Sequence, residues 1–213
     1  MIFRVIMAVS YMLATLMRLY FYLSTQQARG HFTYRESGLT ITAKSALAML
    51  GTIILFGNAL KPAWLAWFTF SFDAWLKWTG AIIGLAGLAL LFWTHRALGE
   101  NFSPFLQLRK QHTLVVSGPY AWVRHPMYTG FVLNIMAWFL LSANWLLGLV
   151  WLIFGIIVTL QVRAEEALLV EKFGDQYQQY MKSTGQFLPY WFRQKISAPT
   201  KLGASPTDNK VIS

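Results

Sequence analysis

The chain has 213 residues, of which 56% are hydrophobic and only 12% are charged, and its formal net charge is +10. A soluble domain of this size has about 25% charged residues, so the composition favours an integral membrane protein over a soluble one. The sequence contains no cysteine, which excludes disulfides, thiolate nucleophiles and cysteine-based metal sites.

Long apolar segments predict the membrane-spanning helices, and they cover residues 2–23, 43–60, 74–93 and 126–160. The last segment would be roughly 52 Å long as one helix, against about 30 Å of hydrocarbon, so it is expected to form a hairpin of two spans. Ser142-Ala143-Asn144 is the expected break. The prediction is therefore an all-α integral membrane protein with about five transmembrane helices. A cleaved signal peptide is the alternative for the first segment, but its length, the charge of Arg18 and the lack of a small-residue cleavage site argue against it.

The distribution of basic residues predicts the orientation in the membrane. Three of them (Arg4, Lys61 and Lys77) lie in parts expected on one side, and fourteen lie in parts expected on the other. Cytoplasmic loops carry the Lys/Arg excess, so the N-terminus is predicted outside and the C-terminus in the cytoplasm. The positive charge then reflects topology, and no nucleic-acid partner is expected. The fourteen are Arg29, Arg35, Lys44, Arg96, Arg109, Lys110, Arg124, Arg163, Lys172, Lys182, Arg193, Lys195, Lys201 and Lys210.

The connections differ in character along the chain. Residues 61–75 are rich in Trp and Phe, which is typical of an aromatic belt at the bilayer surface. Residues 98–120 form the longest cytoplasmic connection and mix polar and apolar side chains. After Leu160, apolar residues at helical spacing predict a helix that lies along the membrane interface. Its apolar face consists of Leu169, Phe173, Tyr177 and Tyr180.

A polar, turn-rich cluster, GPYAWVRHPMYTG at 118–130, directly precedes the most apolar stretch of the chain. Gly118-Pro119 predicts a turn, and Pro126 suits the first turn of a helix that enters the membrane. The free N–H groups and dipole of that helix start favour an anion or a carboxylate. The alternative is that Arg124 and His125 are interfacial anchors beside lipid phosphates.

Two adjacent acids, Glu165 and Glu166, follow four residues after the uncharged run. Acids at membrane depth are costly to desolvate and are commonly functional, so the pair is a candidate to hold an ammonium group, ribose hydroxyls or a metal. Arg163 lies two residues earlier and could pair with one of them; a solvated ion-pair cluster at a helix end is the alternative. The spacing of histidines and acids matches no metal motif, so no metal is expected.

The motifs in their order resemble the isoprenylcysteine carboxyl methyltransferase family, and the phospholipid N-methyltransferases share a related version. The resemblance covers about residues 95–190 and implies a membrane-embedded methyltransferase that depends on S-adenosylmethionine. The chain is then expected to consist of N-terminal helices at 1–94, a methyltransferase core at 95–192 with a cytoplasmic catalytic region, and a tail at 193–213 whose Ser, Thr, Pro, Lys and Asn content predicts disorder. The motifs are HTLVVSGPY from His112, RHPMYTG from Arg124, the apolar hairpin, EEALL from Glu165 and FGDQYQQY from Phe173.

The resemblance also implies site residues. It points to Arg124, Arg163 and Glu166 as catalytic candidates, with Arg163 as the nearest substitute for an arginine that the family commonly has where this chain has Gln161. A second common arginine is replaced by Gln186. The implied cofactor-binding residues are Gln107, His112, Thr113, Leu114, Val115, Tyr120, His125, Pro126, Met127, Tyr128 and Glu165.

The implied acceptor is a lipophilic or lipidated molecule that reaches the site from the membrane lipids, with a prenylated cysteine carboxylate as the leading type. The loss of positive charge at Gln161 and Gln186 leaves a lipid amine or a small thiol as alternatives. A membrane binding protein that keeps the fold without turnover is the non-enzymatic alternative.

Overall fold

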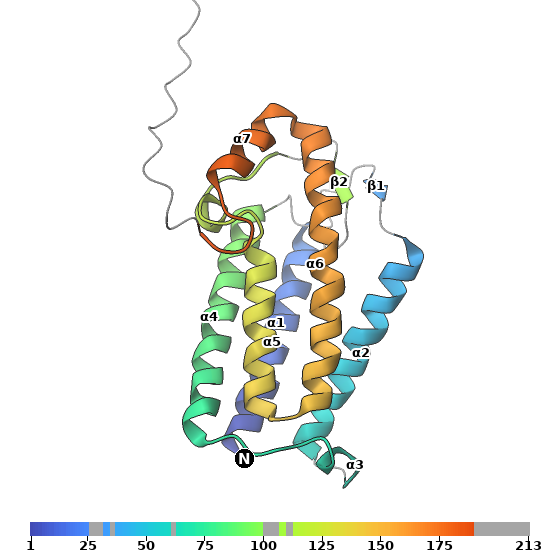
Figure 1. The fold of residues 1–213 in the computed structure, drawn as a ribbon, viewed down its shortest axis with the longest axis vertical. Coiled ribbons are helices and arrows are strands. Elements are labelled where there is room, and N and C mark those ends of the chain that lie inside the picture. The colour runs from blue at the N-terminus through green and yellow to red at the C-terminus, as the bar shows by residue number, and fades with distance from the viewer. Residues whose placement is uncertain (26–31, 35–36, 61–62, 100–106, 110–112, 190–213) are drawn as a thin grey trace, which may run out of the picture.

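Long helices run side by side and alternate in direction through the molecule (Figure 1). The computed structural model describes residues 1–25, 32–34, 37–60, 63–99, 107–109 and 113–189. Within these ranges, the main helices are α1 (Ile2–Thr25), α2 (Gly38–Leu60), α4 (Ala74–Leu98), α5 (Pro126–Ser142) and α6 (Trp145–Phe173).

Short elements join these helices. β1 (Phe32–Tyr34) pairs antiparallel with β2 (Gln107–Arg109), so the connection after α1 lies beside the connection after α4. The remaining elements are α3 (Ala63–Ala66), the 3-10 helix η3 (Gly118–Ala121) and α7 (Asp175–Ser183).

Four of the described helices, α1, α2, α4 and α6, are long and apolar enough to cross a membrane. The fifth, α5, is apolar but has only 17 residues. It is about 25 Å long, slightly short of a hydrocarbon core of about 30 Å. The prediction of an all-α integral membrane protein with about five membrane helices is confirmed.

The predicted hairpin break lies where α5 ends and α6 begins. Ala143 adopts a left-handed conformation with φ of 47°, and Asn144 caps α6 by accepting a hydrogen bond from the Leu147 amide at 2.9 Å. The Asn144 side chain also donates to Asn58 of α2 at 3.3 Å. The turn therefore satisfies its polar groups internally, as a membrane-embedded segment requires.

One apolar core joins the N-terminal helices to the hairpin. Met7 of α1 and Leu55 of α2 are fully buried in the same cluster as Trp138 of α5 and Trp151 of α6. The predicted boundary at residue 94 falls within α4. The division of the chain at that point stays a prediction, and the helices on both sides of it share this core.

Helices α4 and α5 approach each other closely at Gly87. A Cβ added at Gly87 would lie 2.5 Å from the side-chain nitrogen of buried Asn134, which donates to the Gly130 carbonyl at 2.9 Å. Small residues allow such close approach where no hydrophobic effect drives helices together. Gly87 therefore holds α5, and the site at its first turn, against α4.

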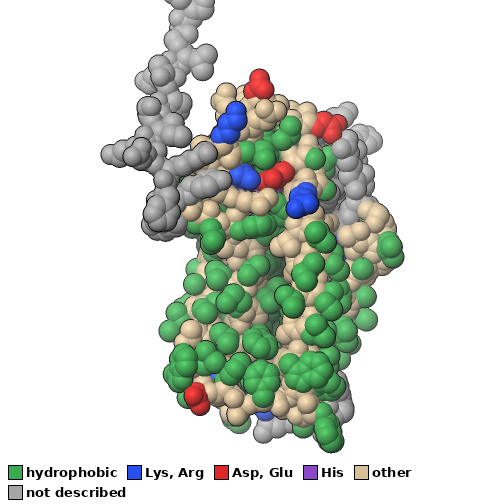
Figure 2. All heavy atoms as spheres, viewed as in Figure 1, with side chains coloured by type: hydrophobic (Ala, Val, Ile, Leu, Met, Phe, Trp, Pro, Cys, Tyr) green, Lys and Arg blue, Asp and Glu red, His purple; other side chains and the backbone are tan. Residues whose placement is uncertain are grey.

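The connections between the helices lie at two opposite ends of the bundle, as the distribution of basic residues predicts. The N-terminus and α3 lie at one end, and β1, β2, η3 and α7 lie at the other (Figure 1). Charged side chains gather near these ends and a hydrophobic band separates them (Figure 2). The alternation of the connections between two sides is thus as expected, whereas the assignment of the α7 end to the cytoplasm stays a prediction.

The region after Leu160 differs from its prediction. No new helix begins there, because α6 continues without a break to Phe173, and Gly174 with φ of 53° separates it from α7. The expected apolar face from Leu169 to Tyr180 is therefore divided between two helices. Glu165 lies 20 residues after Trp145, about 30 Å along the helix, a length that equals the thickness of the hydrocarbon layer.

Candidate active site

The polar cluster before α5 is held by the segment that follows α7. The backbone N–H groups of Arg124 and His125 donate to the carbonyls of Gly185 at 2.7 Å and Gln186 at 3.0 Å. Pro126 occupies the first turn of α5, as predicted. Gly118 has φ of 62°, a backbone conformation that favours glycine, and starts η3. These contacts fix the mouth of the hairpin against the C-terminal part of the described chain.

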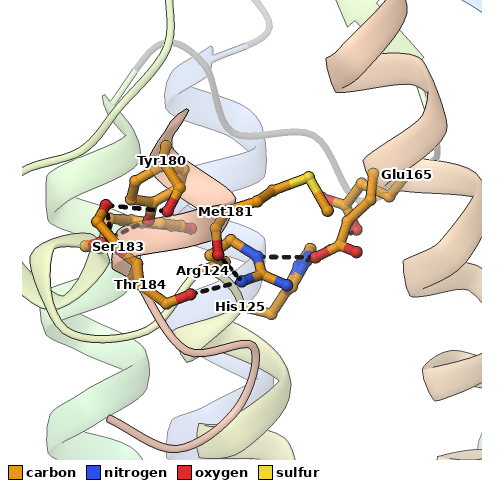
Figure 3. A network of polar contacts seen from close by, with 9 residues as sticks. Arg124, His125, Glu165, Tyr180, Met181, Ser183 and Thr184 are labelled. Carbon is orange, nitrogen blue, oxygen red and sulfur yellow. Dashed lines mark hydrogen bonds and ion pairs between the residues drawn. The ribbon is translucent and has the colours of Figure 1, made fainter. Parts of the chain in front are cut away.

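Arg124 points into the protein and connects three elements. Its Nε donates to Glu166 Oε1 at 2.9 Å, and its Nη1 donates to the carbonyls of Met181 at 3.0 Å and Thr184 (Figure 3). The two charged side chains are only 8% and 13% exposed. Charge-assisted bonds to a carboxylate and to helix-end carbonyls are stronger than neutral ones. Arg124 is thus part of an internal ion pair and not a lipid-facing anchor.

His125 completes the same network. Its Nε2 lies 3.0 Å from Glu166 Oε1, so one carboxylate oxygen is shared by the guanidinium and the imidazole. The imidazole side chain is 3% exposed. The suggested pairing of Arg163 with one of the two acids is wrong: Arg163 is exposed on α6, and no ion pair joins it to a described carboxylate.

Glu165 has a different environment from its neighbour. Its Oε2 accepts a hydrogen bond from the Tyr128 hydroxyl at 2.8 Å and lies 3.9 Å from His125 Nδ1. Its Oε1 contacts no partner among the described residues, and the side chain is 33% exposed. This carboxylate therefore keeps acceptor capacity for a ligand.

Three tyrosines outside the membrane-spanning helices lie near the charged groups of this site, Tyr120 and Tyr177 near the acids and Tyr180 near Arg124. Burial raises the pKa of the Tyr120, Tyr177 and Tyr180 hydroxyls above its usual value, so all three are neutral at physiological pH. Tyr180 donates to the Tyr120 carbonyl at 2.5 Å.

The sequence predicted Tyr177 only as part of an apolar helix face and did not predict a role for its hydroxyl group. Its side chain is 1% exposed, and its hydroxyl is buried without a hydrogen-bond partner in the described part of the chain. Both Glu165 and Glu166 act electrostatically on it. Buried polar groups are nearly always hydrogen-bonded, so this hydroxyl is available to a ligand or a water molecule. The FGDQYQQY motif was the available sequence signal.

The other predicted cofactor residues are placed unevenly. Met127 is half-buried beside buried Pro126 at the start of α5, and Thr113 is exposed. Leu114 and Val115 are half-buried in the segment before η3. His112 and the tail at 193–213 lie outside the described residues, and so does the side chain of Gln107 in β2. The structure brings together Tyr120, His125, Tyr128 and Glu165.

The position of Gln161 has a cationic neighbour that sequence reasoning missed. Lys44 of α2 donates to Gln161 Oε1 at 3.0 Å, and Gln161 lies one helical turn before Glu165. Lys44 and Gln161 are 117 residues apart, so no local pattern links them. Gln186 is half-buried and contributes its carbonyl to the His125 amide.

Comparisons with known proteins identify relatives of this part of the chain. Residues 80–171 match the model of the isoprenylcysteine carboxyl methyltransferase family. The protein-S-isoprenylcysteine O-methyltransferase of Mus musculus is 34% identical over 126 residues, which are 54% of this chain and 42% of that protein. The Schizosaccharomyces pombe protein of the same name is 36% identical over 94 residues, which are 43% of this chain and 40% of that protein. The chain thus spans less than half the length of these relatives.

A solved structure has a similar fold. It is the eukaryotic intramembrane Ras methyltransferase, an isoprenylcysteine carboxyl methyltransferase, with a TM-score of 0.52 and 25% sequence identity. The match covers 68% of this chain and 52% of that one. Sequence, family model and fold therefore agree, and the resemblance of this chain to the isoprenylcysteine carboxyl methyltransferase family is confirmed through residues 80–171.

Proposed function

We propose that the protein is an S-adenosylmethionine-dependent methyltransferase of the isoprenylcysteine carboxyl O-methyltransferase type. It acts on a lipophilic acceptor at the cytoplasmic face of the membrane. The observation that carries the proposal is the unequal state of the two acids. Glu166 is engaged by Arg124 and His125, whereas Glu165 keeps an oxygen for a ligand.

The residues at the site fit the proposed cofactor. S-adenosylmethionine has two cationic groups, an ammonium and a sulfonium, together with ribose hydroxyls that need hydrogen-bond acceptors. The incompletely paired carboxylate of Glu165 suits either a cation or a hydroxyl, and the orphaned Tyr177 hydroxyl offers a further donor or acceptor. When bound, the cofactor supplies a methyl group that is already activated on its sulfonium.

The protein's own residues would then mainly bind, position and exclude water. Arg124 and His125 fix α6 relative to α5, which sets where Glu165 lies. Tyr128 orients the Glu165 carboxylate through its hydroxyl. Holding two reactants in the right geometry is the main requirement when the transferred group needs no further activation. Arg163, exposed on α6, stays a catalytic candidate only for contact with the acceptor.

Cofactor binding is the first test. Calorimetric titration of the purified protein in a neutral detergent should show S-adenosylmethionine binding, and Glu165→Gln should weaken it. Absence of binding by the folded wild-type protein would refute the proposal. Product analysis with methyl-labelled cofactor and a farnesylated cysteine analogue, a lipid amine or a small thiol then identifies the acceptor class.

A further inference from the structure

Arg18 is a cation within the membrane-spanning part of α1. It lies seven residues before the end of the helix at Thr25, a distance of about 10 Å along the axis. Its side chain is half-buried, and its guanidinium lies over the Phe131 ring of α5, 5.3 Å from the ring centroid. The charge therefore faces the bundle at the level of the first turns of α5.

No described carboxylate pairs with Arg18. The three described ion pairs involve Arg124 and His125, and the Arg18 guanidinium lies over the face of Phe131 without a hydrogen bond or an ion pair to a described residue. An aromatic face attracts a cation but accepts none of the five N–H groups in the plane of a guanidinium. Ionisable residues at membrane depth are rare and usually serve a function, because they are costly without a partner.

The guanidinium is close to the proposed active site, because Phe131 lies three residues after Tyr128 on α5, on the same side of the helix. The Tyr128 hydroxyl donates to Glu165, and Tyr128 also interacts electrostatically with Arg18. Tyr128 is thus a neighbour of both a carboxylate on α6 and a cation on α1. A positively charged ligand is favoured on the Glu165 side, and a negatively charged ligand is favoured on the Arg18 side.

We propose that Arg18 is an acceptor-binding residue that forms an ion pair with a carboxylate on the lipophilic acceptor. The planar guanidinium matches the two oxygens of a carboxylate, and its place within α1 lets it meet an acceptor that arrives through the bilayer. Its role is to orient the acceptor beside the cofactor site. This inference rests on the proposed function and adds to it the residue that holds the carboxylate of the acceptor.

The test measures acceptor binding directly, without turnover. Wild-type protein in neutral detergent is titrated with N-acetyl-S-farnesylcysteine and with its carboxamide, which lacks the charge, and tryptophan fluorescence reports binding. The carboxylate should bind about 10- to 150-fold more tightly than the carboxamide, the range of a charge-assisted hydrogen bond. Arg18→Gln should abolish this preference.

Arg4→Gln is the matched control, because Arg4 is on the same helix at the opposite end of the bundle. It should keep the full preference for the carboxylate. Arg18→Lys keeps the charge but loses the planar guanidinium, so it should keep part of the preference for the carboxylate. It replaces Arg18→Gln in the test if the glutamine variant does not fold. An unchanged preference in folded Arg18→Gln, or in Arg18→Lys where it alone folds, overturns the inference.

Two further measurements separate this inference from the proposed function and from lipid binding. If wild-type and Arg18→Gln proteins both bind S-adenosylmethionine while the carboxylate preference is the same in both, only the role of Arg18 fails. If the wild-type protein binds no cofactor, the proposed function fails. An anionic phospholipid that competes with the carboxylate ligand only when Arg18 is present would identify a headgroup site and would also overturn the acceptor role.

Discussion

Glu165 and Glu166 are neighbours on α6, yet their carboxylates have different partners. Glu166 Oε1 accepts from Arg124 at 2.9 Å and lies 3.0 Å from His125 Nε2, whereas Glu165 Oε2 accepts from Tyr128 and from no other residue that the structure describes. Successive residues on a helix point about 100° apart, so one acid can serve the protein and the other a ligand.

The two acids should respond differently to removal of their charge. Glu166→Gln leaves the inward-facing Arg124 without its counter-charge and should lower the stability by about 3 kcal/mol. Glu165→Gln should change the melting temperature little and weaken S-adenosylmethionine binding about 10- to 150-fold. Thermal unfolding in detergent and calorimetry measure the two effects. A stability loss of equal size in both variants would contradict this separation.

Tyr128→Phe keeps the ring and removes the hydroxyl that donates to Glu165. We expect weaker cofactor binding, by up to about tenfold, because a hydrogen bond of this kind contributes about 1.5 kcal/mol. The effect should vanish in a Glu165→Gln background, because the two residues then no longer form a charge-assisted pair. A double-mutant cycle of cofactor affinities measures the coupling, and additive effects would refute it.

Gln161→Arg should lower the melting temperature unless Lys44 is also changed. The Lys44 ammonium lies 3.0 Å from the Gln161 amide oxygen, so an arginine there would meet a like charge. The repulsion should lower the free energy of unfolding by about 1 kcal/mol if water surrounds the two charges, and by more if the protein excludes water from them. Combining Gln161→Arg with Lys44→Gln should restore the melting temperature. Arg163→Ala, an exposed change on the same helix, is the control and should have no effect on stability.

Gly87→Ala should separate α4 from α5. The added methyl group would lie 2.5 Å from the Asn134 side chain, which is itself fixed by a bond to Gly130. Overpacking of this kind costs about 1–3 kcal/mol. Gly155→Ala in α6 is the control, because its methyl group meets only Ile135 at 3.7 Å, an ordinary contact. A lower melting temperature for Gly155→Ala than for Gly87→Ala would contradict this account.

The predicted orientation can be tested with reporter fusions. A reporter placed after Lys195 should lie in the cytoplasm, and one inserted in the connection at 61–73 should lie outside. An alkaline phosphatase fusion is active only outside, and a fluorescent protein fusion reports the cytoplasm. Both reporters on the same side would refute the five-span topology, whereas both on the reversed sides would refute only the orientation.

The sequence by itself determined the membrane helices and the position of the hairpin. Apolar runs of about 20 residues and a polar break at Ser142-Ala143-Asn144 are local signals, and helix formation in a membrane depends on local hydrogen bonds. The start of α5 at Pro126 was predictable for the same reason. The order of short motifs also identified the family resemblance and named both acids.

Only the tertiary structure decided which partner each charge has. Arg124 and Glu166 are 42 residues apart, and Lys44 and Gln161 are 117 apart, so the nearest cation in sequence, Arg163, was the wrong choice for Glu166. The continuation of α6 beyond Leu160 was also not predicted from the sequence. The polar residues after Leu160 mark where the chain reaches the membrane surface, but the helix itself continues to Phe173. Ion pairs depend on distances in space, which are set by how α1, α2, α5 and α6 pack around one core, whereas hydropathy and turn signals act within a few residues of the chain.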